Sequence, residues 1–288
     1  MLPIFDITTL SEAARTESYT YATAVAISRD GTELRAPRRE HPRLSLSLSV
    51  VVSALAHPAL TALRNGNSVL MPLWFAPMRR TGDVYVSTDL PAAESEYVVR
   101  RHLDGSYSAV RTELYGQTPA DDSLAAWPAY EMRQSASSST ASSTTTSVHT
   151  IPLSLETTAP FERYSPPART ILPPDAPAAF AHNFSTALGR EWANDELVFD
   201  AGGIATREVR YQKRLLTLSM LLADEEIQAF REFVHEIQGA ARPFALIPPG
   251  EVKPRLFRLA SDVVHIQHRC AGVATTSLTL VELPVEVQ

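Results

Sequence analysis

The chain has 288 residues, of which 44% are apolar and 20% charged, and its net charge is −6. This length allows two cores of ordinary size, while the acidic balance lacks the basic footprint of a nucleic-acid-binding domain. Because Cys270 is the single cysteine, the sequence provides neither an internal disulfide framework nor a thiolate metal site.

The first residues do not have the pattern of a secretory signal, since they carry Asp6 and no basic segment. No apolar run reaches the roughly 20 residues that span a bilayer. We therefore expect a soluble protein, made in a reducing cytoplasm, with no membrane partner.

After an N-terminal arm at residues 1–12, leucines alternate with serines from Leu44 to Val50, which predicts a strand with one buried face. A short helix is expected next, because Pro58 suits a first helical turn and Asn65-Gly66 a helix end. A proline-bounded extended segment, Pro72 to Pro77, follows it.

The region 82–133 reads as an inserted small β subdomain, with short apolar runs separated by turn signals such as Asp104-Gly105. Residues 134–147 are rich in serine and threonine. Their composition indicates a flexible linker, although threonine also tolerates an extended strand. Residues 159–184 form a proline-rich linker to the second half.

The second half contains a strand around Leu216, Leu218 and Met220, followed by a clearer helix. Asp224 is the expected N-cap of this helix, and Gly239 suits its C-terminal exit. Its apolar stripe, which we expect to be buried as the core helix of this half, comprises Ile227, Phe230, Phe233, Val234 and Ile237.

The two halves repeat one another. Gly31, Arg39, Arg43 and Pro72 recur as Gly202, Arg210, Arg214 and Pro243, and each pair is 171 residues apart. The strand alternation is one residue out of step with this offset, which indicates a bulge or gap between the copies. We therefore predict a mainly β fold of two duplicated β-sandwich-like domains, each with one helix. The first comprises residues 13–81 with 148–158, and the second comprises residues 185–288.

The sequence offers little that indicates catalysis. His265, His268 and Cys270 lack further ligands at close spacing, so ordinary histidines are favoured over a metal site. His235 falls on the polar side of the second helix and is expected to be solvated. Asp121-Asp122 fits a loop and Asp224-Glu225-Glu226 a helix start better than a carbohydrate-cleaving or ion-binding pair. We expect no catalytic residue, metal or organic cofactor.

Arginines are dense just before the first long strand, where they form either a nucleic-acid patch or a protein interface. The negative net charge favours the interface. Aromatic residues are core or interface anchors by default. The candidate interface residues are Arg35, Arg38, Arg39, Arg43, Trp74 and Phe75.

Two stretches of the first half carry a family resemblance. One runs from Glu17-Ser18-Tyr19-Thr20-Tyr21 through Gly31-Thr32-Glu33-Leu34-Arg35 to Pro42-Arg43, and the other is the helix leading to Pro72-Leu73-Trp74. This arrangement resembles minor tail proteins, the distal-tail or tail-tip proteins of siphophages and prophages of Gram-negative bacteria. In that family a strand, a helix and a "P-L-W" strand precede an inserted β region and a second, similar half.

The resemblance implies a structural virion protein that forms a ring at the distal end of a long non-contractile tail. Its implied partners are further copies of itself, with a trimer favoured over a hexamer, the tail tube protein, the baseplate hub and the tape measure protein. DNA would pass through the ring without specific binding. The alternative is a carbohydrate-binding or glycan-cleaving tail-associated protein, since β-sandwiches often carry such sites.

Overall fold

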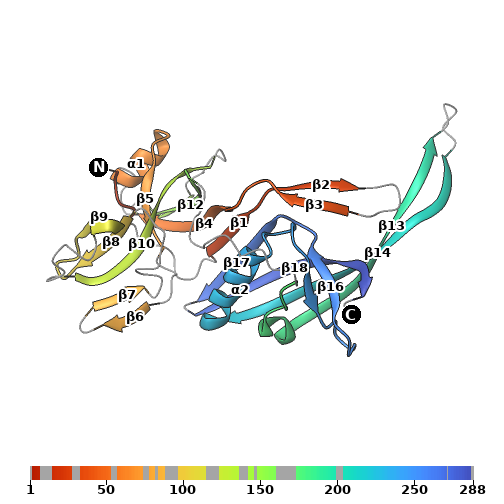
Figure 1. Ribbon diagram of the computed structural model, residues 1–288. Helices are drawn as coiled ribbons and strands as arrows, with labels where there is room; N and C mark the ends of the chain where they lie inside the picture. Colours follow the sequence, from red (N-terminus) through yellow and green to blue (C-terminus); the bar gives the residue numbers. More distant parts are fainter. Residues whose placement is uncertain are drawn as a thin grey trace. The chain divides into compact units, whose positions relative to one another are not determined.

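The computed structural model describes residues 2–6, 15–27, 33–52, 57–73, 78–81, 84–87, 97–114, 123–135, 142–145, 148–159, 173–198, 204–270 and 272–286. Strands predominate in these residues, beside two α-helices, which confirms the prediction of a mainly β chain (Figure 1). The chain forms two compact units. Unit 1 comprises Met1–Tyr19, Arg43–Ser165 and Ile266–Ala274, and unit 2 comprises Thr20–Pro42, Pro166–His265 and Thr275–Gln288.

Unit 1 is built on antiparallel strands around β4 (Arg43–Val52). β4 lies between β1 (Arg15–Thr20) and β12 (Val148–Thr157), and β12 continues to β10 (Ser123–Gln134) and β5 (Val69–Pro72). The predicted alternation is realised in β4, where Leu44, Leu46, Leu48, Val50 and Val52 are buried and the serines between them are not. Helix α1 (Pro58–Arg64) connects β4 to β5 and buries Leu60 and Leu63.

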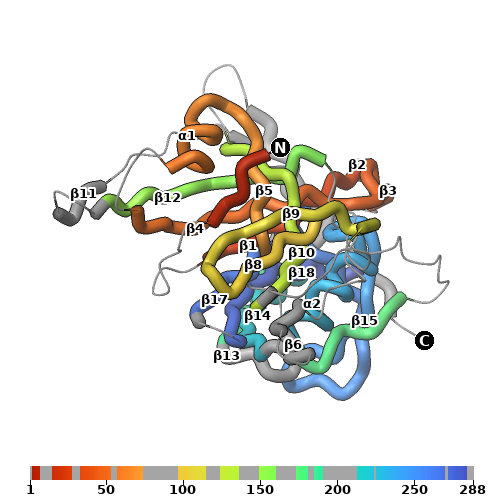
Figure 2. Tube along the Cα trace, turned by 90° about the vertical axis from the view of Figure 1, so that its left-hand side faces the viewer, coloured from red at the N-terminus to blue at the C-terminus, as the bar shows by residue number. Residues whose placement is uncertain are grey.

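The region expected as a separate inserted subdomain shares the sheet of unit 1. Its strands are β6 (Met78–Thr81), β7 (Val84–Ser87), β8 (Tyr97–His102) and β9 (Tyr107–Arg111), followed by the 3-10 helix η1 (Thr112–Leu114). β8 and β9 form a hairpin that lies along one end of β10 (Figure 2). Because the other end of β10 pairs with β5 and β12, this strand belongs to the insertion and to the main sheet at once. β11 (Ser142–Thr145), from the serine- and threonine-rich segment, pairs with the start of β12.

Unit 2 contains a long hairpin of β13 (Asn183–Val198) and β14 (Ile204–Ala223). β14 neighbours β18 (Val273–Glu286), which pairs with β17 (Val263–Cys270) and with β16 (Arg255–Leu259). β16 in turn pairs with β15 (Phe244–Leu246). Residues 20–42, which we expected in the first domain, belong to unit 2 and carry the two-stranded hairpin β2 (Thr23–Ile27) and β3 (Glu33–Pro37).

Helix α2 (Asp224–Glu236) packs its apolar stripe into the core of unit 2. Ile227, Phe230, Phe233, Val234 and Ile237 are each at most 5% exposed. Phe180, on the 3-10 helix η2 (Ala178–His182), contacts this stripe, with ring centroids 5.5 Å from Phe233. The proline-rich segment expected to be only a linker therefore contributes a core residue.

Two expectations about α2 are wrong. The N-cap is Ala223 rather than Asp224, and the Glu226 carboxylate accepts a hydrogen bond from the Ala223 amide at 2.9 Å. His235 is 4% exposed rather than solvated, and its ring stacks on His41 at a centroid distance of 6.0 Å. The helix is therefore covered on more than its apolar stripe, because residues 20–42 pack in the same unit.

Candidate assembly site: a hairpin held in the second unit

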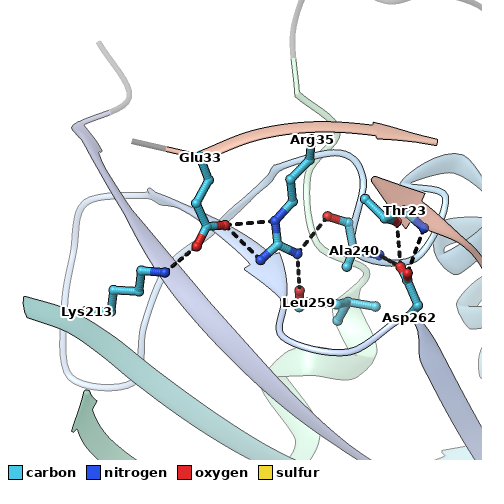
Figure 3. Close-up of polar contacts among 7 residues, drawn as sticks. All are labelled: Thr23, Glu33, Arg35, Lys213, Ala240, Leu259 and Asp262. Carbon is cyan, nitrogen blue, oxygen red and sulfur yellow. Dashed lines mark hydrogen bonds and ion pairs between the residues drawn. The ribbon is translucent and has the colours of Figure 1, made fainter. Parts of the chain in front are cut away.

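The clearest polar site among the described residues holds the β2–β3 hairpin against the core of unit 2 (Figure 3). The backbone makes the first contact, because the Tyr21 amide donates to the Asp262 carbonyl at 2.9 Å. Asp262 lies directly before β17, and Tyr21 lies between the end of β1 and the start of β2. Two segments about 240 residues apart in sequence are thus joined at the base of the hairpin.

The Asp262 carboxylate binds three donors at this junction. It accepts hydrogen bonds from the Thr23 amide at 2.8 Å, from the Thr23 hydroxyl at 2.6 Å and from the Ala240 amide at 3.2 Å. Hydrogen bonds to a charged acceptor are roughly twice as strong as neutral ones. One side chain therefore fastens the start of β2 to the turn that follows α2 (Figure 3).

A second polar cluster fastens β3. Glu33 lies between the Lys213 ammonium of β14 and the Arg35 guanidinium, whose Nε and Nη2 are both 2.8 Å from Glu33 Oε2 (Figure 3). Arg35 Nη1 also donates to the Ala240 carbonyl at 3.2 Å and the Leu259 carbonyl at 3.5 Å. Burial raises the pKa of Glu33, but hydrogen bonds and charge from Lys213 and Arg35 outweigh it and hold that pKa below its usual range.

A third cation, Arg258 of β16, interacts with the same cluster. Arg258 is partly buried, and its Nε and Nη1 atoms are buried without a hydrogen-bond partner in the described structure. Burial, followed by repulsion from Arg35, lowers the pKa of Arg258. Glu33 is the acidic group that offsets this repulsion. Glu33 is thus the central carboxylate of the site.

An apolar contact completes the site. Tyr21 is 5% exposed, and its ring covers Gly239 in the turn after α2. A Cβ atom built on Gly239 would lie 2.8–2.9 Å from Tyr21 Cβ, Cγ and Cδ2, closer than carbon atoms pack. Gly239 also has φ +64°, so the position favours glycine for two independent reasons.

The predicted interface residues are not gathered in one place. Arg35 makes the contacts above, and the Arg39 guanidinium donates to the Tyr21 carbonyl at 3.2 Å. Arg38 and Arg43 are exposed, and Arg43 belongs to unit 1. Trp74 and Phe75 lie outside the described residues. The contacts that the structure gives Arg35 and Arg39 lie within the chain, and their role in an interface with other chains stays a prediction.

The site can bind and position a hairpin. Among the described residues, no three metal-ligating side chains lie close together, and neither helix is long and apolar enough to cross a membrane. A cavity of about 610 Å³ in unit 2 lies between η2 and β15, and its lining includes one carboxylate, Asp175. Glycoside hydrolysis usually requires two facing carboxylates, and the described lining of this cavity supplies one.

Comparison with known proteins leaves the fold to be interpreted from its own geometry. No protein-family model matches the chain, and a search of curated proteins finds no match.

Sequence reasoning identified Arg35 and Arg39 but missed Thr23, Lys213, Gly239 and Asp262. Single polar residues such as these carry no local signal, because each meets its partner only after distant segments fold together. Gly239 was assigned to a helix exit, which is correct, but its second role under Tyr21 is tertiary. Among the residues of this site the repeat marks Arg39, which recurs after 171 positions, and none of the four missed residues.

Proposed function

We propose that this chain is an internally duplicated structural protein that forms a ring at the distal end of a long non-contractile phage tail. The single observation that carries the proposal is that strand ends and helix-exit turns in the two halves share nearly the same spacing. The family resemblance carried by Gly31–Arg35 and Pro72–Trp74 gives the assignment to a tail tip.

The long hairpins support the duplication most directly. β2 ends at Ile27 and β13 at Val198, β3 begins at Glu33 and β14 at Ile204, and all four positions fit the offset of 171. β4 and β14 end at Val52 and Ala223, which keeps the same offset. The register also repeats, since Ile27 pairs with Glu33 and Val198 with Ile204. Independent folds have no reason to share both lengths and register.

The turns after the two helices repeat in their hydrogen bonds. Asn65, Gly66 and Asn67 donate to the carbonyls of Thr61, Leu63 and Ala62. Ile237, Gln238 and Gly239 donate in the same pattern to Phe233, His235 and Val234. Both turns are Schellman-type exits, and they are related by an offset of 172. The buried faces of β4 and β14 show the same extra residue, because the first begins at Leu44 and the second at Leu216, which are 172 residues apart.

A third feature recurs before each hairpin. Pro3 and Phe5 flank a parallel bridge to Leu70, with the Leu70 amide donating to the Pro3 carbonyl at 2.9 Å and the Phe5 amide to the Leu70 carbonyl at 2.8 Å. Pro174 and Ala176 make the same two hydrogen bonds to Ala245, at 2.9 and 2.8 Å. Pro3 and Pro174 are again 171 residues apart.

The order of strands agrees with these local matches. In unit 1 the neighbours run β1, β4, β12, β10, β5, and in unit 2 they run β13, β14, β18, β16, β15. β11 adds to β12 as β17 adds to β18. The strands β6 to β9 are then the insertion that lengthens the first half. Each half thus supplies one domain with a helix between its second strand and the last strand of its sheet.

A duplicated chain suits a ring, because closed rings repeat one heterologous contact by rotation. Three such chains supply six quasi-equivalent domains under threefold symmetry, which would fit a sixfold tube on one side and a threefold hub on the other. The net charge of −6 suits a channel that does not retain DNA. The proposed neighbours are the tail tube, the baseplate hub and the tape measure protein.

Electron cryomicroscopy of intact tail particles tests this proposal. We expect density for the chain around the tail axis, between tube and hub, as three copies arranged with local sixfold symmetry. Six copies would retain the ring but exclude the adaptor role. Density at the capsid or at a fibre tip, away from the tail axis, would contradict the proposed function.

A further inference from the structure

The two helix-exit turns differ in what covers them, although their hydrogen bonds match. In unit 2, Ile237, Gln238, Gly239, Ala240 and Ala241 are all buried, and Tyr21 lies directly on Gly239. In unit 1, residues 64–67 are all exposed, and a Cβ atom on Gly66 would have nothing within 4 Å. The first turn is therefore a surface whose counterpart is a binding site for a hairpin.

The two long hairpins differ in the complementary way. β1 pairs with β17 at one edge, and its Glu17 is 1% exposed, with His268 Nε2 of β17 3.3 Å from Glu17 Oε1. β13 occupies the equivalent place, yet β14 is its only strand neighbour in the described structure. Residues 185–190 are all exposed, and Leu188, at the position of Glu17, is 61% exposed. An open strand edge with an exposed leucine is a template for pairing with another strand.

The strand that would pair with this edge is β11, which also has an open edge among the described strands. β17, which pairs with β1, corresponds to β11 in the first half. β11 pairs with β12, and among the described strands it has no second neighbour. The chain makes this strand contact once internally, between β1 and β17. It also carries the two equivalent strands, β13 and β11, which are not paired with one another.

We propose that β13 and the distal β13–β14 hairpin of one chain dock on unit 1 of a second copy of the chain, along β11 and over the turn 65–67. This inference rests on the proposed duplication, and it specifies the partner and contact by which the proposed ring would form. The template is the contact of the β2–β3 hairpin with the turn 237–241 and of β1 with β17. Since donor and acceptor surfaces differ, the contact is heterologous and repeats from chain to chain until a ring closes.

Cysteine pairs in the full chain, with Cys270→Ser as background, test the contact. Trp192 is the counterpart of Tyr21, and Asn67 is the counterpart of Gly239 by its hydrogen bond. W192C with N67C should give disulfide-linked multimers under mild oxidation, ending in one closed species on a non-reducing gel. The matched control pairs W192C with V252C, since Val252 is 90% exposed and belongs neither to β11 nor to the turn 65–67. Y21C with G239C should instead close within one chain.

A substitution at the open edge gives a second, independent measurement. L188K should weaken self-association of the purified chain by roughly tenfold to a hundredfold in sedimentation velocity, because it removes a leucine that the proposed contact would bury and places a charge on the edge. L221K is the matched control, since Leu221 is 51% exposed on the adjacent strand β14. Unchanged far-UV circular dichroism would show that both variants fold.

The inference is overturned if W192C/N67C yields no more interchain disulfide than W192C/V252C, or if L188K and L221K associate equally well. Neither result would contradict the proposed function, which electron cryomicroscopy of tail particles tests separately. Conversely, specific 192–67 disulfides in a protein found away from the tail axis would support the contact while contradicting the proposed function.

Discussion

Replacing Gly239 by alanine should separate the contribution of the docked hairpin from that of the helix exit. Gly239 has φ +64° and faces Tyr21, whereas Gly66 has φ +76° in the matching turn and faces open space. G66A therefore lowers the free energy of unfolding only through the left-handed backbone penalty, about 1–2 kcal/mol. G239A has the same backbone penalty and also forces a methyl group against Tyr21. By analogy with overpacked cores, this contact adds about 1–3 kcal/mol to the loss of stability.

Chemical denaturation followed by circular dichroism measures both variants, with hydrogen exchange to assign the loss to a unit, because a two-unit chain need not unfold in one step. We expect G239A to lower the free energy of unfolding of unit 2 by about 2–5 kcal/mol and G66A to lower that of unit 1 by about 1–2 kcal/mol.

A double-mutant cycle identifies the cause of the difference. Since the closest Tyr21 atoms include its Cβ, Y21G is required to remove the clash. In the Y21G background, G239A should cost no more than G66A does in the wild type. Equal losses for G239A and G66A, or additive losses in the cycle, would refute the assignment of Tyr21 to this turn.

Three further predictions concern the core helix of unit 2, the Glu33 carboxylate and the metal content. F233A should cost about 3–5 kcal/mol, because it removes a buried ring that contacts Phe180 and Phe244, whereas E232A on the exposed side of α2 should cost about 0.5 kcal/mol or less; urea titration compares them. Because the folded-state pKa of Glu33 lies below its unfolded value of about 4.3, its stabilising effect is present above that value and is lost as the pH falls through the folded pKa. Denaturation midpoints of E33Q should therefore fall less than those of the wild type below about pH 4.3, and E225Q, at an exposed position, should follow the wild type. Elemental analysis of pure protein should find no stoichiometric zinc or iron, and a 1:1 metal content would contradict this.

Features set by local chemistry were predicted well from the sequence. Alternation from Leu44 to Val50 gives the buried face of β4, and the spacing of Phe230, Phe233 and Ile237 gives the buried face of α2. The turn at Gly105, with φ +84°, likewise follows from its Asp-Gly signal. Each of these depends on residues within a few positions of one another.

Features set by distant contacts were not predicted. His235 lies on the polar side of α2, and a hydrophobic period assumes that only one side of a helix is covered. His41 stacks on that side, so His235, which was expected to be solvated, is buried. Phe180 was hidden in a proline-rich segment whose composition indicates a linker. Similarly, residues 20–42 lie between β1 and β4 in the sequence, which assigns them to the first half. Their contacts with Ala240, Leu259 and Asp262 place them in unit 2 instead.

If the two halves are duplicates as proposed, the positions at which their hairpins differ suggest how the chain would avoid incorrect assembly. Within the chain, the docked hairpin uses charge, through Glu33 and Arg35. Under the offset of 171 these positions become Ile204 and Thr206, which carry no charge. A contact within one chain has a high effective concentration and tolerates the desolvation cost of polar groups, whereas a contact between chains gains more from apolar area. On the proposed contact between chains, different chemistry at these two equivalent positions would also disfavour docking of the wrong hairpin.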